Sequence, residues 1–149
     1  MEQVCVHNMT CYDIPEVLEI EKMSFKTPWS EEAFKSEIGR NLAARYITAR
    51  YDGKLVGYGG MWVISGEAHI TNIAVHPDYR GIHIGDLILK TLVKIAALEN
   101  AHDMTLEVRK SNYIAQNLYK KYGFLKEGIR RRYYTDTGED AIIMWRRDA

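Results

Sequence analysis

The sequence predicts an α/β fold, in detail a mixed α+β sheet flanked by helices, and two observations support this prediction. Strand-like and helix-like segments alternate along the chain without internal repeats, low-complexity tracts or a linker. With 149 residues and 46% hydrophobic side chains, the chain is long enough to bury a sizeable core. We therefore expect residues 1–149 to form one domain.

The N-terminal part should contain one strand and two helices. Residues 4–9 are typical of a strand. Asp13 is expected to cap a helix that ends at Met23, with Glu16 completing the capping pair at the third helical position. Ser30 is expected to cap a second helix, whose first turn holds two glutamates that suit the helix dipole.

The middle of the chain predicts mostly antiparallel sheet. Residues 45–51 and 54–64 form an expected hairpin, and residues 69–75 supply the next strand. A helix over 85–99 carries a wide apolar stripe, and a strand over 105–109 follows it. This order of strand, helix and strand implies a parallel pair with a ligand at the carboxyl ends. The remaining expected elements are a helix over 112–122 and strands over 124–134 and 141–146.

The stretch from Ile73 to Leu89 joins a strand to a helix through a turn that holds Pro77 and two glycines. Such a turn leaves backbone N–H groups free at a helix N-terminus, where they bind anions, typically phosphate. Arg80 adds a guanidinium that can reach a phosphate oxygen. The spacing fits neither the dinucleotide fingerprint nor the nucleoside-triphosphatase loop. We expect a nucleotide-derived cofactor of another class, although an ordinary strand-to-helix connection carries similar turn residues.

Charge, cysteine content and hydropathy argue against several kinds of partner. The 20 basic residues balance 20 acidic ones, so no global field draws the chain onto nucleic acid or lipid, and residues 130–132 form only a small basic patch. Cys5 and Cys11 lack CxxC spacing, which argues against a metal site or a disulfide framework. No apolar run reaches the roughly 20 residues that cross a bilayer, and no signal-peptide pattern is present. We expect a cytoplasmic protein with no metal, nucleic acid or membrane partner.

The loop after residue 75 resembles the acetyl-CoA loop of the GNAT acetyltransferase superfamily, whose pattern Q/R-x-x-G-x-G/A follows a strand and precedes a long helix. Arg80 and Gly85 fill its first and last places, and His83 stands where the family usually has glycine. The resemblance implies a GNAT fold that binds acetyl-CoA between splayed central strands, with strand backbone paired to the pantetheine arm. The residues it implies for cofactor binding are Ile73, Ala74, Val75, Arg80, Gly81, Ile82, His83, Ile84, Gly85, Asp86 and Asn112.

Three of these residues have a second interpretation. The His83 side chain either offers a ring N–H to a phosphate or faces solvent from the turn. Asp86 suits the first turn of a helix but would repel a phosphate, so we expect its carboxylate to face outward. Asn112 is expected to cap the helix that it begins, which is compatible with a cofactor contact.

Among GNAT subfamilies, the chain is most similar to the RimI-type ribosomal-protein alanine N-acetyltransferases, over nearly its whole length. The segments that carry this similarity are Pro28-Trp29-Ser30, Asn72-Ile73-Ala74-Val75, Leu106-Glu107-Val108-Arg109 with Ser111-Asn112, Leu118-Tyr119, Tyr122-Gly123-Phe124, Ile129-Arg130-Arg131, Tyr133-Tyr134 and Glu139-Asp140-Ala141-Ile142-Ile143-Met144.

Two residues are candidates for acid–base chemistry. Glu107 lies between Leu106 and Val108 in an expected strand, so alternation turns its carboxylate away from the face that those two bury. The pattern alone leaves it as a solvent-facing residue or a functional one, and the resemblance implies that it is the general base. Tyr119 lies on an apolar helix, where core packing is the default. The resemblance implies that Tyr119 is the general acid that protonates the departing thiolate.

The acceptor amine follows from chemistry and resemblance together. An α-amino group has a pKa of about 8 and a lysine amine one of about 10.4, so a modest base favours a protein N-terminus. The resemblance implies the N-terminal alanine of a small-subunit ribosomal protein as acceptor. Two alternatives stay open: a GNAT enzyme for a small-molecule amine, and a non-catalytic module that binds acyl-CoA or a partner.

Five further residues are candidates for the acceptor site. Trp29, Tyr133 and Tyr134 either line a groove for the acceptor peptide or pack in the core. Arg131 and Arg132 either face acidic residues of the peptide or its ribosomal target, or lie on a solvated strand face.

Overall fold

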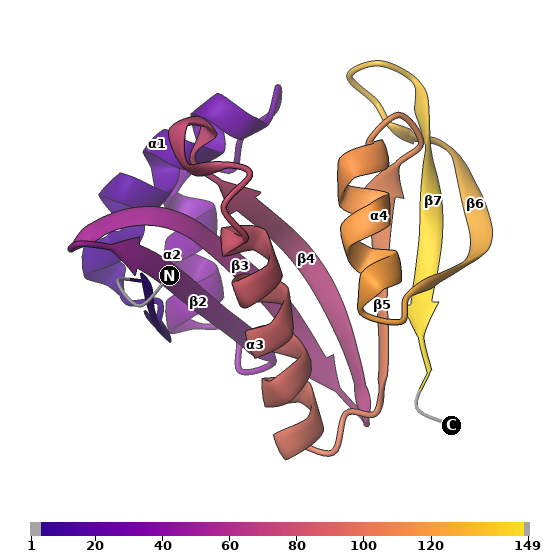
Figure 1. Cartoon of the computed structure of the whole chain (residues 1–149), viewed down its shortest axis with the longest axis horizontal. Helices are drawn as coiled ribbons and strands as arrows, with labels where there is room; N and C mark the ends of the chain where they lie inside the picture. The colour runs from indigo at the N-terminus through magenta and orange to yellow at the C-terminus, as the bar shows by residue number, and fades with distance from the viewer. Residues whose placement is uncertain (1–3, 148–149) are drawn as a thin grey trace.

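The computed structural model describes residues 4–147 and contains one seven-stranded sheet in the order β1-β2-β3-β4-β5-β7-β6 (Figure 1). The strands are β1 (Val4–Asn8), β2 (Ala44–Tyr51), β3 (Lys54–Ile64), β4 (Glu67–Val75), β5 (Asp103–Arg109), β6 (Leu125–Tyr134) and β7 (Glu139–Arg146). The helices are α1 (Ile14–Ser24), α2 (Glu31–Gly39), α3 (Ile84–Leu98) and α4 (Tyr113–Lys121). The predicted mixed α/β sheet is confirmed.

The sheet opens at its centre. All neighbouring strands pair antiparallel except β4 and β5, which run parallel and pair only from Glu67↔Asp103 to His69↔Thr105. Beyond His69 the two strands diverge, with α3 beside β4 and α4 beside β5 (Figure 1). Over residues 70–75, the edge of β4 that faces β5 therefore has no strand partner within residues 4–147. This is the expected parallel pair, splayed at its carboxyl ends.

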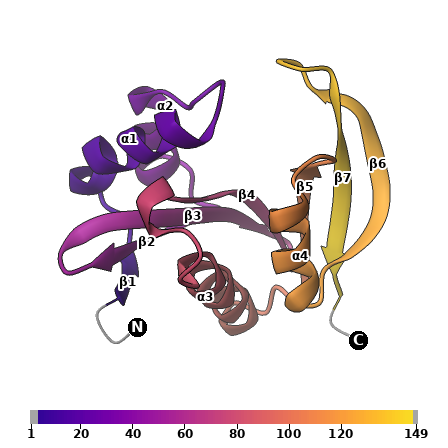
Figure 2. The ribbon, with the colours of Figure 1, turned by 45° about the horizontal axis from the view of Figure 1, so that its top comes forward.

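Helices cover both faces of the sheet (Figure 2). Under α3, Ile88, Leu89 and Leu92 are fully buried in the larger core, to which α4 contributes Tyr119. A smaller core lies under α1 and α2 on the opposite face. A Cβ atom at Gly59 in β3 would lie 2.6 Å from Cγ2 of Ile88. Glycine at this position therefore lets α3 pack close to the sheet.

The predicted elements are all present, with boundaries shifted by one or two residues. Asp13 is the N-cap residue of α1, as expected, but its side chain makes no capping bond to that helix. Asp13 precedes α1, yet its carboxylate accepts the backbone N–H of Thr10 at 2.8 Å and so caps a preceding 3₁₀ turn. Both Asp13 and Glu16 pair with the Arg50 guanidinium, at 2.7 and 3.0 Å. These ion pairs to β2 use the two carboxylates that would otherwise cap the start of α1. Ser30 caps α2 as expected, accepting the Ala33 N–H at 3.1 Å.

No helix within residues 4–147 is both long and apolar enough to cross a bilayer.

Candidate active site

The loop between β4 and α3 presents backbone donors at a helix N-terminus. Gly81 has a φ of 81°, and His83, directly before α3, is left-handed with a φ of 68° and a ψ of 22°. Among the described residues no side chain caps α3. The Arg80 Nε donates to the Val75 carbonyl at 3.1 Å, which fixes Arg80 beside the open end of β4. Uncapped N–H groups beside a fixed guanidinium are suited to an anionic group.

His83 takes a backbone conformation that explains why glycine is common at this position. A left-handed φ is costly for residues with a Cβ atom and costs glycine little. The His83 side chain is 75% exposed, and its Nδ1 lies 3.4 Å from Asp86 Oδ2. The ring thus faces solvent, and a bond from its N–H to a phosphate stays a prediction.

Asp86 does not face open solvent, contrary to expectation. Its carboxylate pairs with Lys121 Nζ at 2.5 Å and accepts the Tyr122 hydroxyl at 3.3 Å, both at the end of α4. Burial alone would raise the pKa of Asp86, but the bonds from Lys121 and His83 outweigh it and lower the pKa. The negative charge beside the α3 N-terminus is therefore neutralised by Lys121. At this end α3 and α4 lie close, since a Cβ atom at Gly85 would be 3.5 Å from Leu118.

Glu107 lies on the face of β5 opposite to the buried Leu106 and Val108, as the alternation predicts. Its side chain is 11% exposed, and Oε1 lies 2.9 Å from Nε2 of His69 on β4. The hydrogen bond from His69 is the largest influence on the pKa of Glu107, and it lowers that pKa against the opposing effect of burial. The Arg130 guanidinium of β6, 3.9 Å from Oε2, lowers it further. The carboxylate is therefore ionised at neutral pH and can accept a proton.

Tyr119 lies in α4, 9% exposed, with its ring 5.9 Å from that of Phe124. Burial raises the pKa of Tyr119 to about 12, so the phenol is protonated at neutral pH. Within the described part of the chain, no hydrogen-bond partner of its hydroxyl is found. This hydroxyl therefore donates its proton to no other group of the described chain.

Tyr134 of β6 connects the surroundings of these two residues. Its ring stacks on the Arg109 guanidinium at 4.1 Å. Burial raises the pKa of Tyr134, Arg109 opposes that rise, and Glu107 and Tyr119 both lie near enough to add to it. Arg109 also pairs with Asp136 at 2.7 Å and so ties β5 to the hairpin between β6 and β7. Glu107 and Tyr119 thus both lie in the surroundings of Tyr134.

Sequence reasoning missed His69, Arg109 and Arg130 as neighbours of the candidate base. Arg109 follows Glu107 by two residues, so strand alternation could have placed it on the same face. His69 and Arg130 are brought to Glu107 by strand pairing, for which no local signal exists. Asn112 was predicted correctly as a cap, since it accepts the Ala115 N–H at 3.1 Å at the start of α4.

The aromatic residues that were candidates for a peptide groove differ in burial. Trp29 packs against Phe34 with 5.2 Å between ring centroids, as part of the smaller core. Tyr133 is 45% exposed beside Tyr134. Arg131 and Arg132 are both exposed. Of these three aromatic residues, Tyr133 is exposed, whereas Trp29 and Tyr134 are half-buried.

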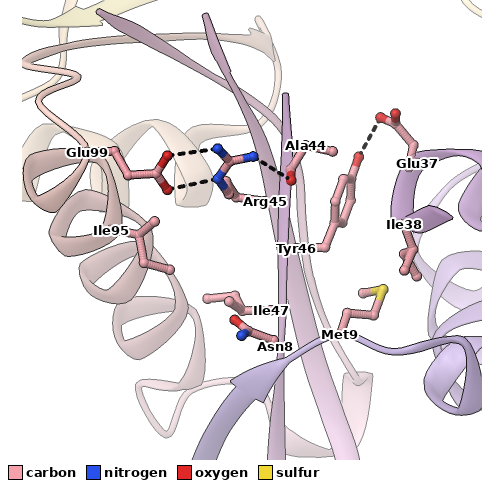
Figure 3. A pocket seen from close by; sticks show the side chains of 10 residues that line it. All are labelled: Asn8, Met9, Glu37, Ile38, Ala44, Arg45, Tyr46, Ile47, Ile95 and Glu99. Carbon is pink, nitrogen blue, oxygen red and sulfur yellow. Dashed lines mark hydrogen bonds and ion pairs between the residues drawn. The ribbon is translucent and has the colours of Figure 1, made fainter. Parts of the chain in front are cut away.

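A cavity of about 380 Å³ lies elsewhere, at the edge of β2 where β1 has ended (Figure 3). Arg45 reaches Glu99 on one side of the strand with a 2.8 Å bond, and Tyr46 donates to Glu37 on the other at 3.0 Å. Arg45 and Glu99 are thus paired with each other, Glu37 accepts the Tyr46 hydroxyl, and the lining contains none of the predicted site residues. The Tyr46 hydroxyl also meets Thr71 of β4 at 2.9 Å, which connects α2 to β4 just beyond His69.

Comparison with known proteins shows the family of this chain. The acetyltransferase (GNAT) family model matches residues 14–124. The chain is 46% identical over 143 residues to a Bacillus subtilis protein named as a candidate ribosomal protein bS18-alanine N-acetyltransferase, covering 96% of this chain and 95% of that protein. It is 36% identical over 141 residues to the ribosomal protein bS18-alanine N-acetyltransferase of Escherichia coli K12, covering 93% and 94%. The crystal structure of the ribosomal-protein-S18-alanine N-acetyltransferase from Escherichia coli matches with a TM-score of 0.88 at 34% identity, covering 98% and 96%. The chain therefore belongs to the GNAT acetyltransferase family.

Proposed function

We propose that this protein transfers an acetyl group from acetyl-CoA to the N-terminal α-amine of a protein, with the N-terminal alanine of ribosomal protein bS18 as acceptor. The names of the two curated relatives support the acceptor. The observation that supports the chemistry is the ionised Glu107, bonded to His69 where β4 and β5 part. The protein would act in the cytoplasm as a single domain spanning residues 1–149.

Acetyl-CoA supplies the acetyl group as a reactive thioester, and the residues present fit it. The unpaired edge of β4 over Ile73, Ala74 and Val75 offers backbone groups to the pantetheine amides, much as an added strand would. The loop from Arg80 through Gly81, Ile82 and His83 offers donors for the pyrophosphate. The N–H groups of Ile84, Gly85 and Asp86 at the start of α3, and Asn112 at the start of α4, complete the proposed set.

Glu107 acts as the general base in this proposal. An α-ammonium has a pKa of about 8, so an ionised carboxylate, directly or through one water, suffices to take its proton. The freed amine nitrogen then attacks the thioester carbonyl carbon. His69 would hold the carboxylate in position through Oε1, which leaves Oε2 for the acceptor.

Tyr119 acts as the general acid. As the carbon–nitrogen bond forms and the carbon–sulfur bond breaks, the phenol gives its proton to sulfur, and the second proton of the nitrogen passes to the phenolate or to solvent. The raised pKa of Tyr119 keeps this proton in place until the thiolate develops. The products are an acetylated N-terminus and CoA thiol.

Thiol release from acetyl-CoA tests this function. The acceptors are a short peptide that begins Ala-Arg-Tyr and the same peptide with a blocked N-terminus. We expect release only with the free N-terminus. Thiol release with a small polyamine, but with neither peptide, would contradict protein N-terminal acetylation and favour a small-molecule acceptor. No release with any acceptor, together with no thermal stabilisation by CoA, would contradict catalysis.

A further inference from the structure

The two oxygens of the Glu107 carboxylate have different neighbours. Oε1 is bonded to His69 from β4 at 2.9 Å. Oε2 has the Arg130 Nε of β6 at 3.9 Å, too far for a hydrogen bond but close enough for strong charge interaction. The Arg130 side chain is 58% exposed, so it borders the approach to Oε2 from solvent. A positive charge thus already stands beside the oxygen that an acceptor ammonium would seek.

We infer that Arg130 is a specificity-determining residue that disfavours cationic acceptors at Glu107 and so selects α-amines over lysine side chains. This inference rests on the proposed function, because it concerns the acceptor of that same reaction. No other residue of the described chain brings a formal positive charge as near to Oε2.

Repulsion between Arg130 and an incoming ammonium would act against any acceptor that arrives charged. The guanidinium carries a permanent charge, and a second cation at Oε2 would lie within a few ångströms of it. A neutral amine meets no such cost. At pH 7.5, roughly a quarter of α-amines but only about one lysine amine in a thousand is neutral. The charge of Arg130 beside Glu107 therefore increases the preference for α-amines over lysine amines that their different neutral fractions already give.

The other groups near Glu107 in the described chain do not place an unpaired positive charge beside Oε2. His69 from β4 occupies Oε1, and Tyr134 from β6 is a buried phenol whose ring stacks on Arg109. Arg109, on the same face of β5, is paired with Asp136 and Glu139 at 2.7 and 3.5 Å. Their carboxylates offset the charge of Arg109, whereas Glu107 itself is the counter-ion of Arg130.

Local structure keeps Arg130 in this place. Its guanidinium lies 5.7 Å from the centre of the Tyr133 ring. Pairing between β6 and β7 is regular at Arg130 and becomes irregular directly after it, before Tyr134. Arg40, directly after α2, is also exposed and forms no ion pair among the described residues. It matches Arg130 in charge and exposure but makes no ion pair with Glu107.

Arg130→Gln tests the inference, with Arg40→Gln as the matched control of equal charge change. The first measurement is KM for the Ala-Arg-Tyr peptide at pH 8.5 and pH 6.5. In the wild type KM should rise steeply at the lower pH, because the protonated acceptor binds less tightly beside Arg130 than the neutral one. In Arg130→Gln that rise should be roughly threefold smaller, a size set by the repulsion of one partly exposed charge. Arg40→Gln should behave as the wild type.

The second measurement is competitive inhibition by an N-terminally blocked peptide with one lysine. Its inhibition constant should fall roughly threefold in Arg130→Gln and stay unchanged in Arg40→Gln. Unchanged KM ratios and inhibition constants in Arg130→Gln, or equal changes in both variants, would overturn the inference. Thermal unfolding of each variant checks that the fold is kept. If the wild-type protein acetylates no α-amine, the proposed function itself is overturned. The wild-type measurement therefore distinguishes failure of the proposed function from failure of the inference about Arg130.

Discussion

His69 Nε2 lies 2.9 Å from Glu107 Oε1, and this bond joins β4 to β5 where their pairing ends. His69 is the last β4 residue in register with β5, opposite Thr105, and Glu107 comes two residues later. The bond therefore holds the candidate base at the mouth of the opening between the strands. The proposed chemistry depends on this placement.

Glu107→Gln should reduce kcat by roughly 10²–10⁴-fold, because an amide of the same shape cannot accept the proton. The Kd for CoA, measured by calorimetry, should stay within about twofold, since Glu107 is not part of the cofactor loop. Glu127→Gln is the matched control, as Glu127 pairs with Arg147 at the surface. A Glu107→Gln variant with near-wild-type turnover would rule out Glu107 as the base.

His69→Ala should move the acid limb of the pH profile of kcat/KM to higher pH. The bond from His69 lowers the pKa of Glu107, so its removal raises that pKa and protonates the base at a higher pH. Activity should therefore fall most at pH 6 and recover in part at pH 8.5. A uniform loss at all pH values would mean that His69 acts on something other than the ionisation of Glu107.

Tyr119→Phe should lower kcat by roughly 10²-fold while leaving the fold intact. Because the hydroxyl has no partner within the described residues, its removal leaves no other polar group unpaired. The free energy of unfolding from urea titration should thus be unchanged or slightly higher. Loss of both stability and activity would indicate a packing role in place of acid catalysis.

His83→Gly should raise the free energy of unfolding slightly, by up to about 1 kcal/mol. Glycine avoids the cost of a Cβ atom at a φ of 68°, although it gains backbone entropy in the unfolded chain. Because the imidazole is exposed, the Kd for CoA should not weaken. A clear weakening, strongest below pH 6.5, would instead show that the ring binds a phosphate. His83→Val, with a branched side chain at the same φ, should destabilise the protein.

Much of the candidate site could be predicted from the sequence because its signals are local. The glycines of the turn after residue 75 can be read from the sequence, and they predict the turn before α3. The alternation of residues on β5 predicts the face on which Glu107 lies. The cap at Asn112 is likewise local.

The remaining features depend on contacts between distant segments. In the sequence Asp13 resembles an ordinary helix cap, but in the fold its carboxylate pairs with Arg50 of β2. Asp86 would face solvent if Lys121 did not lie beside it. His69 and Arg130 reach Glu107 only through the register of β4 with β5 and of β6 with β7. Strand register is set by the assembled sheet, so local patterns do not report it.

The most direct test of the proposed function is the position of the acetyl group on the acceptor. Ribosomal protein bS18 with a free N-terminal alanine is incubated with acetyl-CoA and the purified protein, and the product is sequenced by tandem mass spectrometry. The proposal predicts one acetyl group, on the α-amine of the first residue. Acetyl groups on lysine side chains, or an unmodified N-terminus after full incubation, would contradict it.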